Sequence, residues 1–139
     1  MLSRRAALAR LGGAFMVFAL PRGVWRRDET FPHPDPRPGI TAANVIAEDK
    51  LPNKKKVRAL YAAARENPEI FDGIYCTCHC SDQGHRSLLS CFESEQATGC
   101  WGCQEVAEEV SSLIKDGKSL KEIRDGVDAK FSKASRDHH

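Results

Sequence analysis

The cysteines of this chain are concentrated in one short stretch. All six lie between residues 76 and 103, together with two of the five histidines. Thiolates and imidazoles bind soft and borderline metal ions, and cysteines also carry thiol–disulfide chemistry. The sequence therefore predicts a soft-metal site or a thiol–disulfide centre. The candidate ligands are Cys76, Cys78, His79, Cys80, His85, Cys91, Cys100 and Cys103.

The spacing of the first cysteines favours metal binding. Cys76, Cys78 and Cys80 alternate with other residues, and cysteines two positions apart form a disulfide only with strain, whereas their thiolates can hold one soft ion or bridge two. With Cys100 and Cys103 the donors outnumber the four that one tetrahedral zinc ion needs. This excess favours a polynuclear Cu(I) arrangement or two sites. We expect Cu(I), with zinc as the alternative.

Two other uses of the cysteines stay open. Cys100-x-x-Cys103 begins an expected helix, where the positive end of the helix dipole makes a thiol reactive, so thiol–disulfide exchange is the main alternative. The strand–helix alternation of thioredoxin-like proteins is not visible around it. Covalent haem is disfavoured because Gln104, not histidine, follows Cys103. An exported chain could also use its cysteines as a framework of structural disulfides.

Residues 1–23 predict an export signal. Arg4 and Arg5 precede an apolar run from Leu11 to Leu20. The run is shorter than the about 20 apolar residues of a membrane span, and paired arginines are typical of a twin-arginine signal. An uncleaved membrane anchor is the alternative, because no clear Ala-x-Ala cleavage site precedes Trp25. We therefore expect a periplasmic or extracellular protein that meets the membrane only during export or through an uncleaved signal.

The charge and composition exclude several classes of function. The formal net charge of +2 becomes −2 without the four arginines of residues 1–23, so nucleic-acid binding has no support. No Ser/His/Asp arrangement, phosphate loop or supported carboxylate pair is visible, and hydrolytic catalysis has no support either. Residues 24–40 contain four prolines at alternating positions, which predicts an extended linker with His33 in solvent.

The remaining chain predicts a small all-α domain over residues 41–133, followed by a disordered tail at 134–139. Expected helices run from Thr41 to Glu48, from an Asn53 cap to Asn67, from a Ser81 or Asp82 cap through Phe92, from Cys100 to Gly117, and from the Ser119 capping box through Phe131. Their apolar residues recur at helical spacing, and a single turn is expected near Ile70. The loop that begins at Cys76 is expected to lie across helix ends.

Several segments together resemble a family of bacterial exported proteins named for a PCYCGC motif. They are residues 68–80, 84–88, Cys91-Phe92, Cys100-x-x-Cys103 and residues 117–124. The resemblance covers residues 40 to 131, and it implies an exported, metal-binding domain in a largely uncharacterised family. Tyr75, Thr77 and His79 stand where the motif has proline, tyrosine and glycine, and the family's usual lipid anchor is missing.

These observations give one functional expectation and one runner-up. The expectation is an extracytoplasmic protein that binds, stores or delivers Cu(I), with a metal donor or acceptor protein as its partner. The runner-up is a thiol–disulfide protein that uses Cys100 and Cys103. Its source is a short resemblance of residues 117–125, after a Cys-x-x-Cys helix, to the small helical thioredox proteins of cytochrome c maturation.

Overall fold

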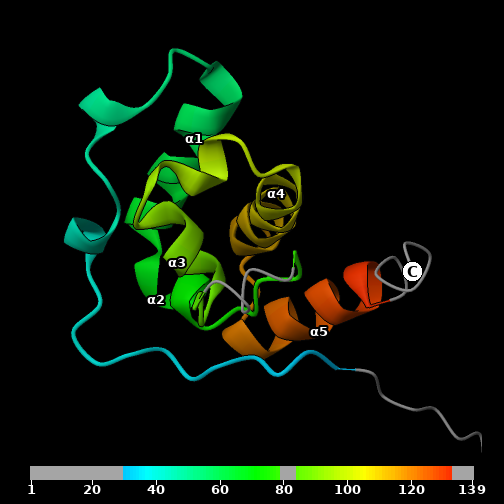
Figure 1. The fold of residues 1–139 in the computed structure, drawn as a ribbon. Helices are drawn as coiled ribbons and strands as arrows, with labels where there is room; N and C mark the ends of the chain where they lie inside the picture. Colours follow the sequence, from blue (N-terminus) through cyan, green and yellow to red (C-terminus); the bar gives the residue numbers. More distant parts are fainter. Residues whose placement is uncertain (1–29, 79–83, 133–139) are drawn as a thin grey trace, which may run out of the picture.

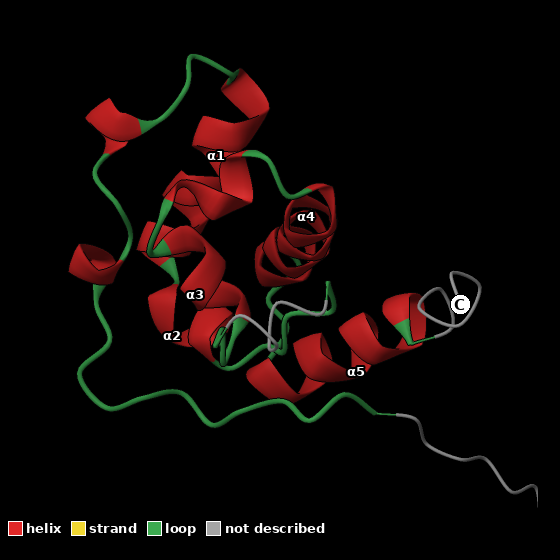
Figure 2. Cartoon of the chain, in the orientation of Figure 1, coloured by secondary structure: helices red, strands yellow, loops and turns green. Residues whose placement is uncertain are grey.

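The computed structural model describes residues 30–78 and 84–132, and in this part the chain is helical without strands (Figure 2). The all-α prediction is therefore confirmed. The predicted signal (1–23) and tail (134–139), His79, Cys80 and the expected cap at Ser81 or Asp82 lie outside the described residues. The helix expected from that cap is shorter than predicted, because it begins at Leu88 with Ser87 as its N-cap. None of the helices among the described residues is long and apolar enough to span a membrane. The helices are η1 (Ala42–Asn44), η2 (Glu48–Lys50), α1 (Lys55–Glu66), α2 (Pro68–Asp72), α3 (Leu88–Phe92), η4 (Glu95–Thr98), α4 (Trp101–Lys115) and α5 (Leu120–Phe131).

Helix α4 is the central element of the bundle. It packs against α1 on one side and α5 on the other, and its first turns also contact α3 (Figure 1). The apolar stripes predicted for these helices face one another and form one core. Its helical members include Val57, Leu60, Tyr61 and Ala64 of α1, Leu88, Leu89 and Phe92 of α3, Val106, Ala107 and Val110 of α4, and Ile123, Val127 and Phe131 of α5.

Three aromatic rings fill the space between α1, α2 and α3. The ring of Phe92 meets Tyr61 edge to face at 4.7 Å and Phe71 at 5.4 Å, and such pairs add to the stabilisation that burial of the rings provides. The Tyr61 hydroxyl donates a 2.7 Å hydrogen bond to the carbonyl of Ser94. The cluster therefore fixes α3, which carries Cys91, against the longer helices.

Local signals set both ends of α4 and the start of α5 as predicted. Cys100 is the N-cap of α4. Gly117 has a φ of 73° and donates its N–H to the Ile114 carbonyl, as expected for the residue that ends a helix. Ser119 and Glu122 exchange the two hydrogen bonds of a capping box. These local features connect α4 and α5 through a short turn.

The expected helix from Thr41 to Glu48 is wrong. Thr41 does cap a helical turn, but η1 ends at Asn44 because Val45 turns into the core and the N–H of Ile46 donates to the Phe92 carbonyl. Tertiary contacts thus interrupt the helix. The expected cap at Asn53 is also wrong, since Lys54 donates to the Pro52 carbonyl in a tight turn and is itself the N-cap of α1.

Residues 30–40, which we call the strap, are extended but packed on the helices. The strap runs beside α5 and then past α2 (Figure 1), held by hydrogen bonds from Phe31 N–H to Asp128 and from Arg124 to the Pro34 carbonyl. The prediction that His33 lies in solvent is wrong, because its side chain is 7% exposed. Its two ring nitrogens have partners in the folded domain, and these partners give the proline-rich segment a fixed path.

Candidate metal centre

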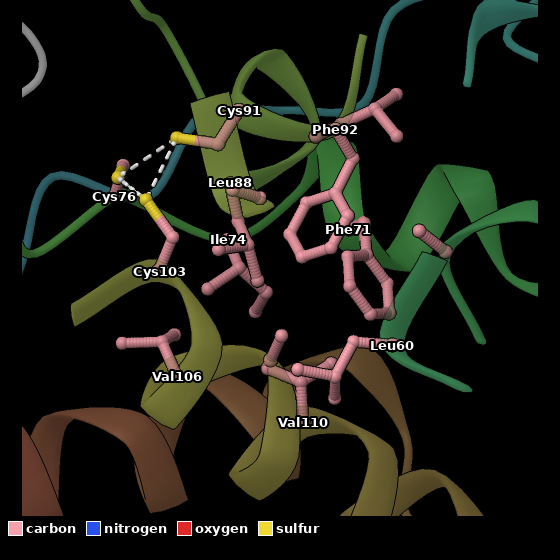
Figure 3. Packing of buried hydrophobic residues seen from close by; sticks show 14 of the residues in the cluster. Leu60, Phe71, Ile74, Cys76, Leu88, Cys91, Phe92, Cys103, Val106 and Val110 are labelled. Carbon is pink, nitrogen blue, oxygen red and sulfur yellow. Dashed lines mark hydrogen bonds between the residues drawn. The ribbon is translucent and has the colours of Figure 1, made fainter. Parts of the chain in front are cut away.

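Four cysteine sulfurs meet in one place. The Sγ atoms of Cys76, Cys78, Cys91 and Cys103, here called the sulfur cluster, all lie within 4.8 Å of one another. The closest pairs are Cys76–Cys78 at 3.0 Å, Cys91–Cys103 at 3.1 Å and Cys78–Cys103 at 3.2 Å. Figure 3 shows the sulfurs of Cys76, Cys91 and Cys103 pointing toward one another.

Three structural elements bring these side chains together. Cys76 and Cys78 lie in the loop that follows α2, as predicted for this part of the motif, and Cys91 belongs to α3. Cys103 lies in the first turn of α4, on the same face as Val106 and Val110, because residues three and seven positions apart align on a helix. The apolar faces that build the core therefore also direct Cys91 and Cys103 inward.

The sulfur cluster lies at the edge of the hydrophobic core. Cys76 is 2% exposed and both Cys91 and Cys103 are 0% exposed, whereas Cys78 is partly exposed. Leu88, Ile74 and Val106 lie next to the sulfurs (Figure 3). A thiolate in such surroundings is costly unless a cation or a hydrogen bond compensates its charge.

The sulfurs perturb one another's ionisation in opposite directions. A hydrogen bond with Cys103 is the largest cause that lowers the pKa of Cys76. Contacts with Cys76, Cys78 and Cys91, together with burial, raise the pKa of Cys103. For Cys91 the contact with Cys103 lowers the pKa. The contacts with Cys76 and Cys78, together with burial, outweigh this effect, so the pKa of Cys91 is raised. Without metal, loss of a proton is thus easier at Cys76 than at Cys91 or Cys103.

The dimensions of the cluster suit a soft metal ion. With Zn–S bonds of about 2.3 Å, two sulfurs of a tetrahedral site lie about 3.8 Å apart. Five of the six sulfur pairs are separated by 3.0 to 3.9 Å, close to this value, and a bound cation would replace the thiol protons. The same separations exceed the S–S bond length of a disulfide, about 2.05 Å, so these cysteines are free thiols in the structure.

Two further donors border the cluster. The Nδ1 atom of His85 lies 3.3 Å from the Cys91 sulfur. The sulfur of Cys100 lies 3.6 Å from that of Cys78 and accepts a hydrogen bond from the Cys103 N–H at 3.3 Å. Of the eight predicted ligands, the structure thus brings four into the cluster and places these two at its border. His79 and Cys80 lie outside the described residues.

Gly102 permits the close approach of the loop to α4. A Cβ atom at this position would lie 3.0 Å from the Cβ of Cys78, closer than side-chain carbons normally come. The glycine between Cys100 and Cys103 therefore gives the Cys78 side chain its place above the helix start. The side chain of Trp101, between Cys100 and Gly102, is 68% exposed.

A network of ion pairs supports both ends of the loop that carries the cysteines. Asp72, which is 0% exposed, accepts hydrogen bonds from Arg37 of the strap, from Arg86 beside His85, and from Ser87. His33 Nδ1 accepts the Tyr75 N–H at 3.0 Å, directly before Cys76. Sequence reasoning missed these supporting residues, since no local pattern links a strap residue to Asp72 or Tyr75.

The hydrogen-bond partners of His33 determine the protonation state of its imidazole ring. Since Nδ1 accepts the Tyr75 N–H, the ring proton belongs on Nε2, which lies 3.1 Å from the Asp128 carboxylate. Burial lowers the pKa of His33, and the opposing effect of Asp128 does not restore it. The neutral ring is therefore the form that joins the strap to α5 and to the loop.

Comparison with known proteins identifies the class to which this domain belongs. Residues 40–137 match the model of a family described as a protein of unknown function with a PCYCGC motif. The chain belongs to this family, as its motif spacing predicted. Neither the curated proteins nor the solved structures contain a match.

Proposed function

We propose that this protein binds Cu(I) through its clustered thiolates and stores or delivers the ion outside the cytoplasm. The observation that supports the proposal is the convergence of four cysteine sulfurs within 4.8 Å. These side chains come from a loop and two helices, and three of them are buried. A bound cation compensates the thiolate charges, which the apolar surroundings would otherwise disfavour.

The donor set favours Cu(I) over zinc in this proposal. Thiolates select Cu(I), and a single zinc ion uses four ligands. Here the partly exposed Cys100 and the imidazole of His85 border the four clustered sulfurs. Because one thiolate can bridge two Cu(I) ions, the four clustered sulfurs can hold more than one ion. The predicted export signal would place this chemistry in the periplasm or outside the cell, where a donor or acceptor protein exchanges the metal.

The thiol–disulfide alternative rests on the position of Cys100 and Cys103 at the start of α4. In the structure, however, the Cys103 sulfur contacts Cys91 and Cys78 at 3.1 and 3.2 Å and belongs to the four-sulfur cluster. The described residues also contain no strand before this helix. These features favour Cys103 as one ligand of a shared metal site over a redox pair that it would form with Cys100.

Anaerobic metal titration tests the proposal. The untagged protein is reduced, and Cu(I) is added in competition with bathocuproine disulfonate, with metal content measured by mass spectrometry. We expect more than one Cu(I) ion per chain. The Cys91→Ser variant should lose affinity by about tenfold or more. The matched control is Val110→Ala, which removes packing from an equally buried position of α4 and should leave the affinity unchanged.

Three results would contradict the proposal. A single zinc ion that Cu(I) cannot displace would assign a structural zinc site. Loss of all titratable thiols without bound metal would assign a disulfide framework. Dithiol reductase activity that needs Cys100 and Cys103 but no metal would assign thiol exchange. Equal loss of Cu(I) affinity in Cys91→Ser and Val110→Ala would show that unfolding, and not ligand removal, explains the effect.

A further inference from the structure

The cysteines at the start of α4 differ in their access to solvent. Cys103 is 0% exposed, while Cys100, three residues earlier, is partly exposed. Across from it, Cys78 is also partly exposed, and its sulfur lies 3.6 Å from that of Cys100. In the described part of the chain, Cys76, Cys91 and Cys103 are buried. An incoming molecule can therefore reach the cluster from the side of Cys78 and Cys100.

Cys100 is held at this border by the helix itself. Its sulfur accepts the Cys103 N–H at 3.3 Å, and its carbonyl accepts the Gln104 N–H at 3.2 Å. Its side chain thus has a fixed direction, and its sulfur contacts Cys78, a member of the four-sulfur cluster. This position connects solvent with the cluster while leaving Cys100 outside the closest group of four.

The residue after Cys100 adds an apolar contact to this border. Trp101 is 68% exposed and is the large hydrophobic side chain that the described residues leave in solvent. A single exposed apolar residue is common on protein surfaces, so it carries no conclusion alone. Because it directly follows Cys100 in the chain, it is a candidate docking contact for a molecule that presents a thiolate to Cys100.

We propose that Cys100 and Cys78 form an exchange edge, through which Cu(I) passes between an external thiolate and the buried sulfurs. This inference rests on the proposed Cu(I) function. In uptake, the Cys100 sulfur forms a bond to Cu(I) as a donor thiolate leaves, and the proton of the Cys100 thiol passes to that thiolate. Cys78 then binds the ion as the bond to Cys100 breaks, and the proton of the Cys78 thiol passes to the Cys100 sulfur. The ion next bonds to the buried sulfurs, whose thiol protons are released to solvent. Copper remains Cu(I) throughout, and no electron is transferred.

The partner implied by this edge is a carrier that holds Cu(I) with thiolates. Ligand exchange between sulfurs needs an intermediate in which donor and acceptor sulfurs share the ion, and the 0% exposed sulfurs of Cys91 and Cys103 cannot meet a donor directly. Cys100 therefore contributes to the rate of transfer more than to the final affinity.

The experiment uses Cu(I)–glutathione as the thiolate donor. Uptake is followed anaerobically by stopped-flow fluorescence of Trp101 in a Trp25→Phe background, which removes the other tryptophan. The final affinity is measured separately with bathocuproine disulfonate. Cys100→Ser retains an N-cap oxygen, and serine is a preferred N-cap residue, so the variant should keep α4 folded. The matched variant is Cys91→Ser, which removes a buried ligand.

We expect Cys100→Ser to slow uptake by about tenfold or more and to change the affinity by less than about threefold. Cys91→Ser should lower the affinity by about tenfold or more. Uptake by Cys100→Ser at the native rate overturns the exchange edge and leaves the proposed function intact. An affinity loss in Cys100→Ser equal to that of Cys91→Ser also overturns it, because Cys100 would then be a permanent ligand. Failure of the native protein to bind Cu(I) overturns the proposed function itself.

Peptide-resolved alkylation gives a second readout that does not depend on transfer kinetics. In the reduced, metal-free protein, iodoacetamide should modify Cys78 and Cys100 before Cys91 and Cys103, as their exposure indicates. Earlier modification of Cys91 or Cys103 would place the entrance elsewhere and contradict the proposal.

Discussion

Replacement of Asp72 by asparagine should destabilise the domain more than any change to its surface ion pairs. The carboxylate is 0% exposed and accepts hydrogen bonds from the backbone N–H of Arg37 at 2.7 Å, from Arg37 Nη2 at 2.8 Å, from Arg86 Nη1 at 2.9 Å and from Ser87 Oγ at 2.9 Å. Asparagine preserves the shape of the side chain but removes its charge and directs an NH2 group at some of these donors.

The size of the effect follows from the surroundings of each partner. Hydrogen bonds to charged groups contribute about 1.5–3 kcal/mol each. The side chains of Arg37 and Arg86 are 36% and 38% exposed, so both guanidinium groups can recover part of this energy from water. We therefore expect Asp72→Asn to lower the free energy of unfolding by about 2–4 kcal/mol. A domain of this size has about 5–15 kcal/mol in total.

Urea denaturation of the reduced, metal-free protein at neutral pH measures this difference. The control is Glu93→Gln, which removes the other carboxylate bound to Arg37 but lies at a side chain that is 30% exposed. It should cost less than about 1 kcal/mol. If Asp72→Asn were no more destabilising than this control, the assignment of Asp72 as the buried centre of the network would be wrong.

Acid titration of the native protein and of Asp72→Asn tests whether the charge of the carboxylate stabilises the fold. Burial tends to raise the pKa of Asp72, but hydrogen bonds from Arg37 and Ser87 outweigh it and lower the pKa. A lowered pKa in the folded state means that the carboxylate stabilises the protein above its unfolded pKa of about 3.9 and that this contribution is lost as the pH falls through the lowered value. The stability difference between native protein and Asp72→Asn should therefore shrink in that window.

Three further variants test other parts of the structure. His33→Asn should lower the free energy of unfolding at neutral pH. Because burial lowers the pKa of His33, the stability advantage of the native protein should shrink as the pH falls below about 6.5. A stability difference between the two proteins that does not change between about pH 7 and 5 would contradict the neutral, buried ring. Gly102→Ala should crowd Cys78, whose Cβ lies 3.0 Å from the new carbon, and weaken Cu(I) binding by about tenfold without destabilising α4; unchanged affinity in the competition titration would show that the loop adjusts freely. Tyr61→Phe removes the hydrogen bond to Ser94 and should lower the unfolding free energy by about 1 kcal/mol in urea, whereas no change would indicate that water satisfies the Ser94 carbonyl.

The sequence predicts the long helices because the signals that form them are local. The stripe of Val57, Leu60, Tyr61 and Ala64 and the capping box at Ser119 and Glu122 both depend on residues within one or two turns of each other. The helix expected after Thr41 fails for the opposite reason. Its end is set by the contact of Ile46 with Phe92, 46 positions away in the chain.

The sequence also predicts the pool of ligands but not which sulfurs meet. Cys91 and His85 lie six residues apart, and the spacing allowed a shared site only if one of them lay at a helix end. His85 does precede α3, and its Nδ1 lies 3.3 Å from the Cys91 sulfur. The separation of Cys103 from Cys100, one buried in the cluster and the other at its border, depends on the packing of α3 and the loop against α4, which spacing alone does not encode.

The packed strap differs most from the sequence prediction, because a proline-rich, charged segment has the composition of a solvated linker. Its contacts connect residues 35 to 97 positions apart in the chain, such as Arg37 with Asp72 and Phe31 with Asp128. Prolines suit this role, since they lower the entropy lost when an extended segment is fixed on a surface.

The strap fixes the described ends of the loop that carries Cys76 and Cys78. On one side of the loop, His33 holds the Tyr75 N–H directly before Cys76, and on the other side Arg86, next to His85, binds both Asp72 and the Asp35 carbonyl. The strap residues that make these contacts precede the segment, residues 40–137, that matches the family model. Fixing both ends of the loop before metal binds lowers the ordering cost of ligation. Substitutions of the strap residues that make these contacts should therefore weaken metal binding, although they remove no sulfur ligand.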